Sequence, residues 1–217
     1  MKKLFPLVTA DIALFTLKED KLRALIIRRE NQPAQGEWAL PGGILQPEAD
    51  TSLDDTARRV LRSKTGVDTL YLEQVMTASS PDRDPRGWSL SVLYYALLPS
   101  DLVPAVAGIS VEAISWFDPE ATDPQLAFDH GMLLQRALTT LRKKVRDGAL
   151  PLHLLPEQFT LTDVQHAYEA VLGSRIDKGA FRRKIKDEPS LLAIDGELLR
   201  GPQRPAQIYR TADDFKF

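Results

Sequence analysis

The sequence contains no cysteine, and this absence excludes disulfide bonds, zinc sites with thiolate ligands and cysteine nucleophiles. It also carries little net charge, because 28 lysines and arginines nearly balance 30 aspartates and glutamates. Only a local basic patch could therefore bind nucleic acid. No apolar run reaches the roughly 18 residues that a membrane-spanning helix requires. We expect a soluble protein that is compatible with the reducing cytoplasm and has no membrane partner.

The chain of 217 residues is long enough for one large domain or for a medium-sized domain and a smaller one, and its 43% hydrophobic residues suffice for a packed core. Two lysines precede an apolar run at the N-terminus, as they do in signal peptides. However, Pro6 and Asp11 interrupt this run, and no small-residue cleavage site follows. We interpret the run as a first β-strand.

Residues 1–150 have the pattern of a mixed α/β domain. A helix is expected at residues 53–64, started by Thr51 or Ser52, with two aspartates in its first turn. A linking helix is expected at residues 127–146, with cations in its last turn. Strands are predicted at residues 7–17, 23–29, 71–78, 90–98 and 112–117, with a turn at residues 18–21.

Residues 151–217 predict a second domain with shorter elements. Thr162 and Gln165 form a capping-box pattern that opens a helix to about residue 172, and Asp177 can cap another helix to about residue 187. Two short helices joined by a tight turn are typical of a helix-turn-helix. Predicted strands at residues 191–194 and 206–210, around a loop at residues 201–205, complete a winged helix-turn-helix domain.

The segment at residues 40–67 has the frame of a phosphate-binding site. Gly42 and Gly43 allow a tight turn before the first helix, Arg59 falls on that helix, and Gly66 ends it. This arrangement resembles the Nudix box, the phosphate-chemistry motif of Nudix hydrolases, whose helix carries three metal-binding glutamates. The resemblance implies that the first domain is an α/β/α sandwich with a mixed sheet.

The three glutamates are missing from this frame. In the alignment that runs backwards from Gly66, Val60, Ser63 and Lys64 stand at their positions. Mg²⁺ needs carboxylate or phosphate oxygens, and Lys64 would place a positive charge inside the coordination sphere. We therefore expect no metal, no cofactor, no catalytic residue and no enzyme activity by the family mechanism. Four carboxylates at the loop and helix start could in principle restore a metal site, although a capping role suits them better: Glu48, Asp50, Asp54 and Asp55.

A domain without catalysis can still bind the ligand for which its fold is shaped. Arg29 stands at the end of a predicted strand and begins the segment at residues 29–33, and Arg83 and Arg86 lie in the stretch Asp-Arg-Asp-Pro-Arg-Gly-Trp. Both segments resemble those of Nudix proteins that act on ADP-ribose, and guanidinium groups suit phosphate oxygens because they donate two parallel hydrogen bonds. We predict that Arg29, Arg83 and Arg86 bind a nucleotide diphosphate. Surface ion pairing with Asp82 and Asp84 is the alternative.

Residues 174–186 form a strongly basic stretch, with six cations against one aspartate. On a helix, Ala180, Phe181 and Ile185 would point inward as an apolar stripe. Cationic side chains on the opposite face could then reach phosphates and the guanine edge in the major groove, although a merely solvated helix has the same pattern. The predicted DNA contacts are Lys178, Arg182, Arg183 and Lys186 on the helix and Arg200 and Arg204 on the wing.

In this order, the parts resemble the Nudix-related transcriptional regulators of the NrtR family over nearly the whole chain. The degenerate Nudix box, the Asp-Arg-Asp-Pro-Arg-Gly-Trp stretch, residues 126–130 and the C-terminal winged helix carry the resemblance. It implies a homodimer that binds a palindromic operator in double-stranded DNA, represses genes of NAD metabolism and releases DNA when ADP-ribose or a related nucleotide binds.

Three other functions are compatible with the residues. The chain could be a divergent hydrolase of ADP-ribose-like substrates, a sugar-responsive regulator of the same layout, or a nucleotide-sensing module with a protein partner. His130 could cap the linking helix together with Asp129 and sense the ligand, but a structural cap is the expected role. His153 and His166 are expected to be structural as well.

Overall fold

The computed structural model describes residues 5–69, 71–102, 106–121, 125–146, 148–199, 205–212 and 215. The chain divides into two units. The first comprises Met1–Phe15, Arg23–Leu98 and Val103–Thr140, and the second comprises Thr16–Leu22, Pro99–Leu102 and Leu141–Phe217. Among the helices in the described ranges, none is long and apolar enough to span a membrane.

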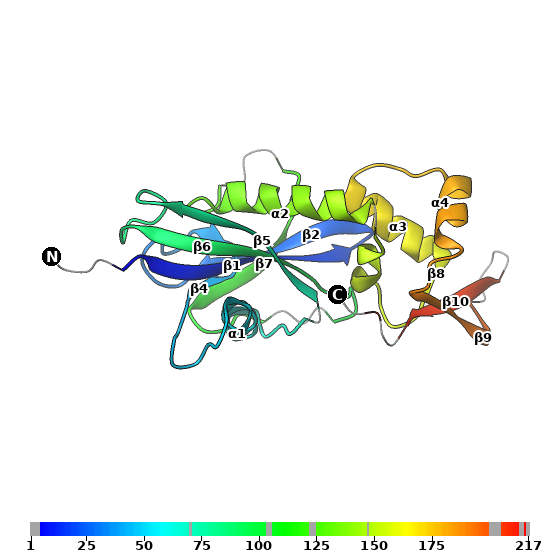
Figure 1. Cartoon of the computed structure of the whole chain (residues 1–217), viewed down its shortest axis with the longest axis horizontal. Helices are drawn as coiled ribbons and strands as arrows, with labels where there is room; N and C mark the ends of the chain where they lie inside the picture. The colour runs from blue at the N-terminus through cyan, green and yellow to red at the C-terminus, as the bar shows by residue number, and fades with distance from the viewer. Residues whose placement is uncertain are drawn as a thin grey trace. The chain divides into compact units, whose positions relative to one another are not determined.

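A mixed sheet of seven strands, counted over the described ranges, forms the centre of the first unit (Figure 1). Its main path has the order β3-β2-β1-β6-β5, while β4 pairs with β1 and β7 pairs with β2. β1 and β6 are parallel, with Leu7 opposite Ser89, whereas β5 and β6 are antiparallel. The strands are β1 (Leu7–Lys18), β2 (Lys21–Arg29), β3 (Trp38–Ala39), β4 (Gly42–Ile44), β5 (Tyr71–Ser80), β6 (Ser89–Leu97) and β7 (Val111–Phe117).

Most of this sheet follows the sequence prediction. The predicted turn between β1 and β2 is confirmed, with Glu19 and Asp20 at left-handed φ values of 52° and 57°. The five predicted strands correspond to β1, β2, β5, β6 and β7. β3 and β4 were not predicted, because strands of two and three residues are too short to show the alternation of apolar and polar side chains.

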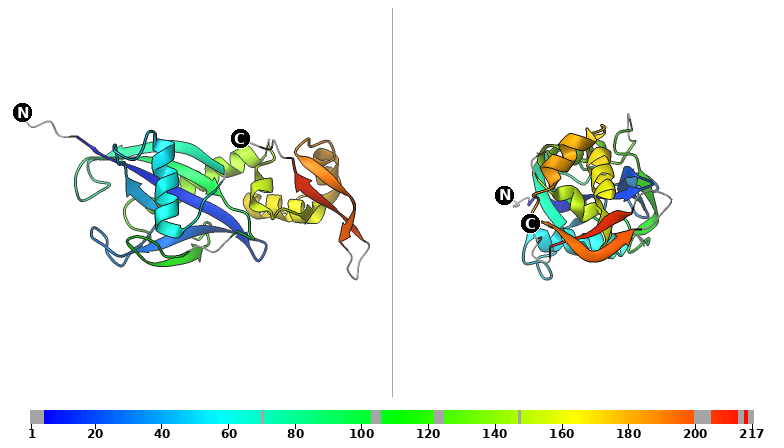
Figure 2. Two further views of the ribbon diagram at one scale, coloured as in Figure 1. Left: turned by 90° about the horizontal axis from the view of Figure 1, so that it is seen from below. Right: turned by 90° about the vertical axis from the view of Figure 1, so that its right-hand side faces the viewer.

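Helices cover both faces of the sheet, so the first unit is an α/β/α sandwich, as the resemblance implied. α1 (Leu53–Thr65) crosses one face, where Val60 and Leu61 join the buried core (Figure 2). Ser52 caps its start by accepting a hydrogen bond from the Asp55 backbone N–H at 3.1 Å. Gly66 ends it at a left-handed φ of 69°. Of the two predicted caps, Ser52 is therefore the correct one.

α2 (His130–Val145) lies along the other face of the sheet (Figure 1). Leu133, Leu134 and Ala137 are fully buried on this helix. The predicted start at residue 127 is wrong by three residues. Phe128 has a left-handed φ of 58°, and the Ala127 backbone N–H donates a hydrogen bond to the Trp38 carbonyl at 2.7 Å, so a turn precedes the helix.

The second unit contains a helix-turn-helix followed by a β-hairpin, which is the winged helix that the sequence predicted (Figure 1). In its described part, three strands form a sheet in the order β8-β10-β9. The elements are a 3-10 helix, η1 (Leu150–Leu154), then β8 (Phe159–Thr160), α3 (Leu161–Leu172), α4 (Lys178–Ile185), β9 (Leu191–Leu199) and β10 (Ala206–Thr211).

Three details of the second unit differ from the prediction. The capping box of α3 is formed by Thr160 and Asp163, because Thr160 at the end of β8 is still extended while Thr162 is already helical. α4 ends at Ile185 instead of residue 187. β9 continues to Leu199, well beyond the predicted end at residue 194. Asp177 caps α4, as predicted, and Gly173 ends α3 at a left-handed φ of 69°.

The burial of His153 predicts that the stability of the protein falls with acidification. Its ring stacks on Phe215 with centroids 4.4 Å apart, and burial lowers its pKa from 6.5 to about 4. The unfolded chain therefore binds this proton more readily than the folded chain does. The contribution to stability is complete above pH 6.5 and is lost as the pH falls to about 4, with a total of up to about 3 kcal/mol.

We expect His153→Phe, which keeps an aromatic ring beside Phe215, to remove this part of the pH dependence. Urea unfolding of both proteins between pH 4.5 and pH 7.5 measures the effect. The same loss of stability in both proteins over this range would show that other groups are responsible.

Candidate functional site

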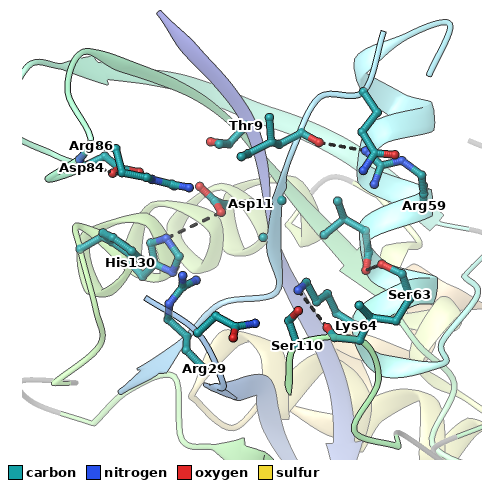
Figure 3. A pocket seen from close by; sticks show the side chains of 18 of the residues that line it. Thr9, Asp11, Arg29, Arg59, Ser63, Lys64, Asp84, Arg86, Ser110 and His130 are labelled. Atoms are coloured by element: carbon teal, nitrogen blue, oxygen red, sulfur yellow. Dashed lines mark hydrogen bonds and ion pairs between the residues drawn. The ribbon is translucent and has the colours of Figure 1, made fainter. Parts of the chain in front are cut away.

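A cavity of about 590 Å³ opens in the first unit between the sheet and α1 (Figure 3). Its walls come from β1, β4, α1, the segments after β2 and β5, and the turn before α2. All three predicted ligand-binding residues, Arg29, Arg83 and Arg86, line it. Segments that are far apart in the sequence thus bring the three arginines to one cavity.

Arg86 is more exposed than Arg83, the other arginine in the loop between β5 and β6. Its guanidinium donates two hydrogen bonds to the buried Asp84 carboxylate, at 2.9 and 2.6 Å, and 42% of its side chain is exposed. These hydrogen bonds hold the pKa of Asp84 below its usual range. Arg86 is therefore held toward the cavity by an acidic neighbour while part of its guanidinium remains accessible.

Arg83 is almost completely enclosed, with 6% of its side chain exposed. It donates two hydrogen bonds to Asp129, at 3.0 and 2.9 Å, and one to the Ser89 hydroxyl at 3.2 Å. The Asp11 carboxylate lies 3.6 Å from the same guanidinium. Arg83 therefore links the cavity to Asp129, which immediately precedes α2.

Arg29 approaches the cavity from the end of β2. Its Nε donates a hydrogen bond to the Pro33 carbonyl at 2.8 Å, and its guanidinium lies 5.0 Å from the centre of the Phe128 ring. Burial, followed by the nearby positive charge of Arg86, lowers the pKa of Arg29. The arginines thus repel one another at the edge of the cavity.

His130 has a structural role, but it does not act as the predicted helix cap. It is the first residue of α2, and its Nδ1 accepts a hydrogen bond from the Leu40 backbone N–H at 3.0 Å. Its Nε2 lies 3.7 Å from Asp11 Oδ1, and burial lowers the pKa of the imidazole. The ring therefore fixes the chain just before Gly42 and also lines the cavity.

Gly42 and Gly43 let β4 pass very close to its neighbours. A Cβ on Gly42 would lie 2.0 Å from Asp11 Oδ1, and one on Gly43 would lie 2.6 Å from a methyl carbon of Val60. Both glycines are thus required for the close approach of this segment to β1 and α1. Asp11 itself, a pocket residue that sequence analysis did not assign, could have been suspected because it is a charge within an apolar strand.

An ion pair between Arg59 and the buried Asp50 holds the Nudix-like frame. Arg59 donates two hydrogen bonds to Asp50, both at 2.6 Å, and a third to the Ile44 carbonyl at 2.9 Å. The Asp50 side chain is 1% exposed, and its hydrogen bonds with Arg59 hold its pKa far below the usual range. Asp50 is therefore fully engaged in fixing the loop before α1.

The other carboxylates of this region also have structural partners. Asp54 accepts a hydrogen bond from the Tyr94 hydroxyl at 2.6 Å, and Asp55 accepts hydrogen bonds from the backbone N–H and the hydroxyl of Thr51. Glu48 is the exception, since it is exposed and its carboxylate has no hydrogen-bond or ion-pair partner among the described residues. In the described ranges, no group of three acidic or histidine side chains could hold a metal ion.

The residues at the three glutamate positions do not fit a divalent metal ion. Val60 is buried in the core, and the Ser63 hydroxyl donates a hydrogen bond to the Val60 carbonyl at 3.1 Å. Lys64 extends into the cavity, where its Nζ donates a hydrogen bond to the Ile109 carbonyl at 2.9 Å (Figure 3). A methyl group, a hydroxyl group and an ammonium group provide no set of hard anionic ligands.

The second candidate site is α4 of the winged helix. Phe181 and Ile185 seat this helix, and each is 3% exposed, whereas Ala180 is exposed, contrary to the prediction. The Phe181 ring meets the Tyr168 ring edge-on, with centroids 5.3 Å apart. Glu169 of α3 fixes the intervening turn by accepting a hydrogen bond from the Ile176 backbone N–H at 2.9 Å.

The cationic face of α4 is open. Lys178, Arg182, Arg183 and Lys186 are exposed, and within the described part of the chain none of them has an ion-pair partner. Lys184 differs, since it donates a hydrogen bond to the Arg146 carbonyl at 2.6 Å. Arg200 and Arg204, the predicted wing contacts, lie outside the described residues.

Comparison with protein families identifies both parts of the chain. The NUDIX domain family matches residues 7–137, and the NrtR DNA-binding winged helix domain family matches residues 151–211. The ADPR responsive transcriptional repressor NtrR of Acinetobacter baylyi is 43% identical over 214 residues, which cover 98% of this chain and 85% of that protein.

Two solved structures of Shewanella oneidensis NrtR are also similar. The first is its crystal structure complexed with a 27mer DNA, with a TM-score of 0.84 and 34% identity over 94% of this chain and 93% of that chain. The second is its NUDIX domain complexed with ADP ribose, with a TM-score of 0.58 and 37% identity over 64% of this chain and 90% of that chain.

Proposed function

This chain belongs to the NrtR family of Nudix-related transcriptional regulators, and from that premise we propose that it is a DNA-binding repressor that releases its operator when ADP-ribose binds. One combination of features carries the proposal. The Nudix cavity has residues that do not fit a metal ion at the glutamate positions, and the same chain contains a winged helix with an exposed cationic face. The Nudix domain senses the nucleotide instead of hydrolysing it.

The DNA-binding part extends from about residue 151 in this proposal. Lys178, Arg182 and Arg183 of α4, together with Lys186 directly after it, contact the major groove and the flanking phosphates. Arg200 and Arg204 contact the backbone or minor groove. One recognition helix per subunit reads one half-site. A homodimer therefore requires a palindromic operator in double-stranded DNA, with half-site centres about 10 base pairs or a multiple of that distance apart.

The nucleotide-binding part extends to about residue 150. Arg29 and Arg86 reach the diphosphate, and their guanidinium groups suit its oxygens because they donate paired hydrogen bonds. Arg83 completes the arginine set, although its present hydrogen bonds to Asp129 must rearrange for direct contact with the ligand. ADP-ribose is a breakdown product of NAD, and we propose that the regulated genes serve NAD metabolism.

The connection between the two activities runs through α2. Asp129, the hydrogen-bond partner of Arg83, directly precedes this helix, and the last residues of the helix belong to the second unit. There, Arg142 donates a hydrogen bond to the Val171 carbonyl of α3 at 2.8 Å. A ligand that breaks the hydrogen bonds between Arg83 and Asp129 can thus change the position of α2 and, through it, of the helix-turn-helix. Typical coupling free energies of about 1–3 kcal/mol correspond to roughly 5–150-fold weaker operator binding.

We expect ADP-ribose to release a fluorescent palindromic operator from the full-length protein, as measured by anisotropy. Arg86→Ala should blunt the release and leave DNA binding without ligand nearly intact, since Arg86 lies in the cavity. Arg182→Ala with Arg183→Ala should weaken operator binding by about 1–3 kcal/mol per residue that reads a base. Arg62→Ala, an exposed arginine of α1, is the matched control.

Unchanged affinity and salt dependence in the double variant would refute the assignment of α4 as the recognition helix. ATP, NAD and arabinose serve as comparison ligands. Release by arabinose alone would move the protein to the sugar-responsive regulators of the same layout.

We also expect no hydrolysis of ADP-ribose at a useful rate with Mg²⁺ or Mn²⁺, because Val60, Ser63 and Lys64 cannot hold the metal ion. Chromatographic detection of AMP and ribose phosphate over several hours measures this activity. Steady AMP release by the wild type that disappears in Asp54→Asn or Asp55→Asn would contradict the expectation and identify a rebuilt metal site.

A further inference from the structure

The cavity faces an electrostatic problem if it binds ADP-ribose. A diphosphate carries about two negative charges, and in hydrolytic Nudix proteins divalent metal ions neutralise such charge. The residues at the metal-ligand positions of this chain do not fit a metal ion, so other groups must supply the positive charge. Lys64 occupies one of those three positions and lines the cavity.

On the basis of the proposed function, we infer that the Lys64 ammonium replaces the divalent metal ion as the counter-charge of the diphosphate, so that ADP-ribose binds without any metal. Lys64 belongs to the last turn of α1, and the hydrogen bond from its Nζ to the Ile109 carbonyl holds it at the cavity. Figure 3 shows it on the wall opposite Arg86, with Arg29 between them at the cavity edge. A ligand phosphate in the cavity therefore meets cations from two sides.

Lys64 differs from Arg59, the other cation of α1 at the cavity, because it is not paired with a carboxylate of the described chain. Arg59 is bound to Asp50, whereas Lys64 has no ion pair within the described ranges. Burial, followed by the positive charge of Arg29, lowers the pKa of Lys64. The ligand-free pocket therefore holds an ammonium group that is partly desolvated and repelled by its neighbour. The negative charge of an anion that enters the cavity offsets both penalties.

Isothermal titration of the full-length protein with ADP-ribose, in EDTA and again in MgCl₂, tests this role. The wild type should bind equally well in both buffers. Lys64→Met should weaken binding about tenfold to a hundredfold, the range typical of a hydrogen bond to a charged group. Lys64→Arg should retain most of the affinity because it keeps the charge. Lys21→Met, which removes an exposed lysine at the start of β2, should bind like the wild type.

Thermal melting separates binding from folding. The Lys64→Met variant should melt no lower than the wild type, because burial disfavours the charge that the substitution removes. A wild type that binds only with Mg²⁺, or a Lys64→Met variant with unchanged affinity, would overturn the inference and leave the proposed function standing. A wild type that does not bind ADP-ribose in either buffer would overturn the proposed function and this inference with it.

A second inference comes from Thr9 on β1. Thr9 lines the cavity and is 7% exposed, yet its hydroxyl is buried without a hydrogen-bond partner in the described part of the chain. Such an unsatisfied buried polar group costs stability. Asp11 lies two residues further along β1 and therefore on the same face of the strand. A carboxylate beside Thr9 disfavours a phosphate at this place, so a neutral hydroxyl group suits the Thr9 hydroxyl better than a phosphate oxygen does.

We propose that Thr9 Oγ1 forms a hydrogen bond with a sugar hydroxyl of the bound nucleotide, which again rests on the proposed function. Thr9→Val keeps the shape of the side chain and removes only the hydroxyl. It should raise the melting temperature of the ligand-free protein and weaken ADP-ribose binding about twofold to tenfold. Thr9→Ser, which keeps the hydroxyl, should stay close to the wild type in affinity.

Thr9→Val should thus raise the melting temperature and weaken ADP-ribose binding. These opposite effects distinguish a ligand contact from a purely structural residue. Unchanged or tighter ADP-ribose binding by Thr9→Val, in a background where the wild type binds, would refute the assignment of Thr9. The proposed function would be untouched by that result.

Discussion

The ion pair between Arg59 and Asp50 is the constraint on which the cavity depends. Its two hydrogen bonds, together with one from Arg59 to the Ile44 carbonyl, tie the loop that contains β4 to α1. Thr56 also donates a hydrogen bond to Asp50, at 2.9 Å. A buried carboxylate that loses such a partner is strongly destabilising, so the loop has little freedom to leave this position. The protein chain itself therefore fixes this wall of the cavity.

With the frame fixed in this way, the chemistry of the cavity can change at single positions. The backbone of α1 presents residues 60, 63 and 64 toward the loop and the cavity, whatever their side chains are. Val60 packs against Gly43, while Lys64 brings an ammonium group to the place where a carboxylate would recruit a metal ion. A change of side chain at these positions therefore changes the charge of the cavity wall without changing the backbone that forms it. Control of DNA binding by a ligand requires, in addition, that ligand binding in the first unit is coupled to the second unit.

Sequence patterns predicted the features that depend on local rules. Ser52 and Gly66 at the ends of α1, Asp177 at the start of α4 and the winged-helix topology all follow from capping and periodicity. The predicted start of α2 was wrong, because the left-handed conformation of Phe128 depends on tertiary contacts. The same holds for the capping box of α3, where β8 keeps Thr160 extended. The three arginines were placed in one cavity by fold analogy, whereas no sequence rule reveals that Arg83 is enclosed by Asp129 and Ser89.

The pairing of Arg86 with Asp84 has a consequence for the concentration at which a sensor of this kind responds. A ligand phosphate that recruits Arg86 competes with a carboxylate that already occupies the guanidinium through two hydrogen bonds. Part of the intrinsic binding free energy is spent on that exchange, so the apparent dissociation constant is higher than that of a pocket with an unoccupied arginine. Such internal competition sets the response threshold, because a sensor with maximal affinity would be saturated at every level of its signal.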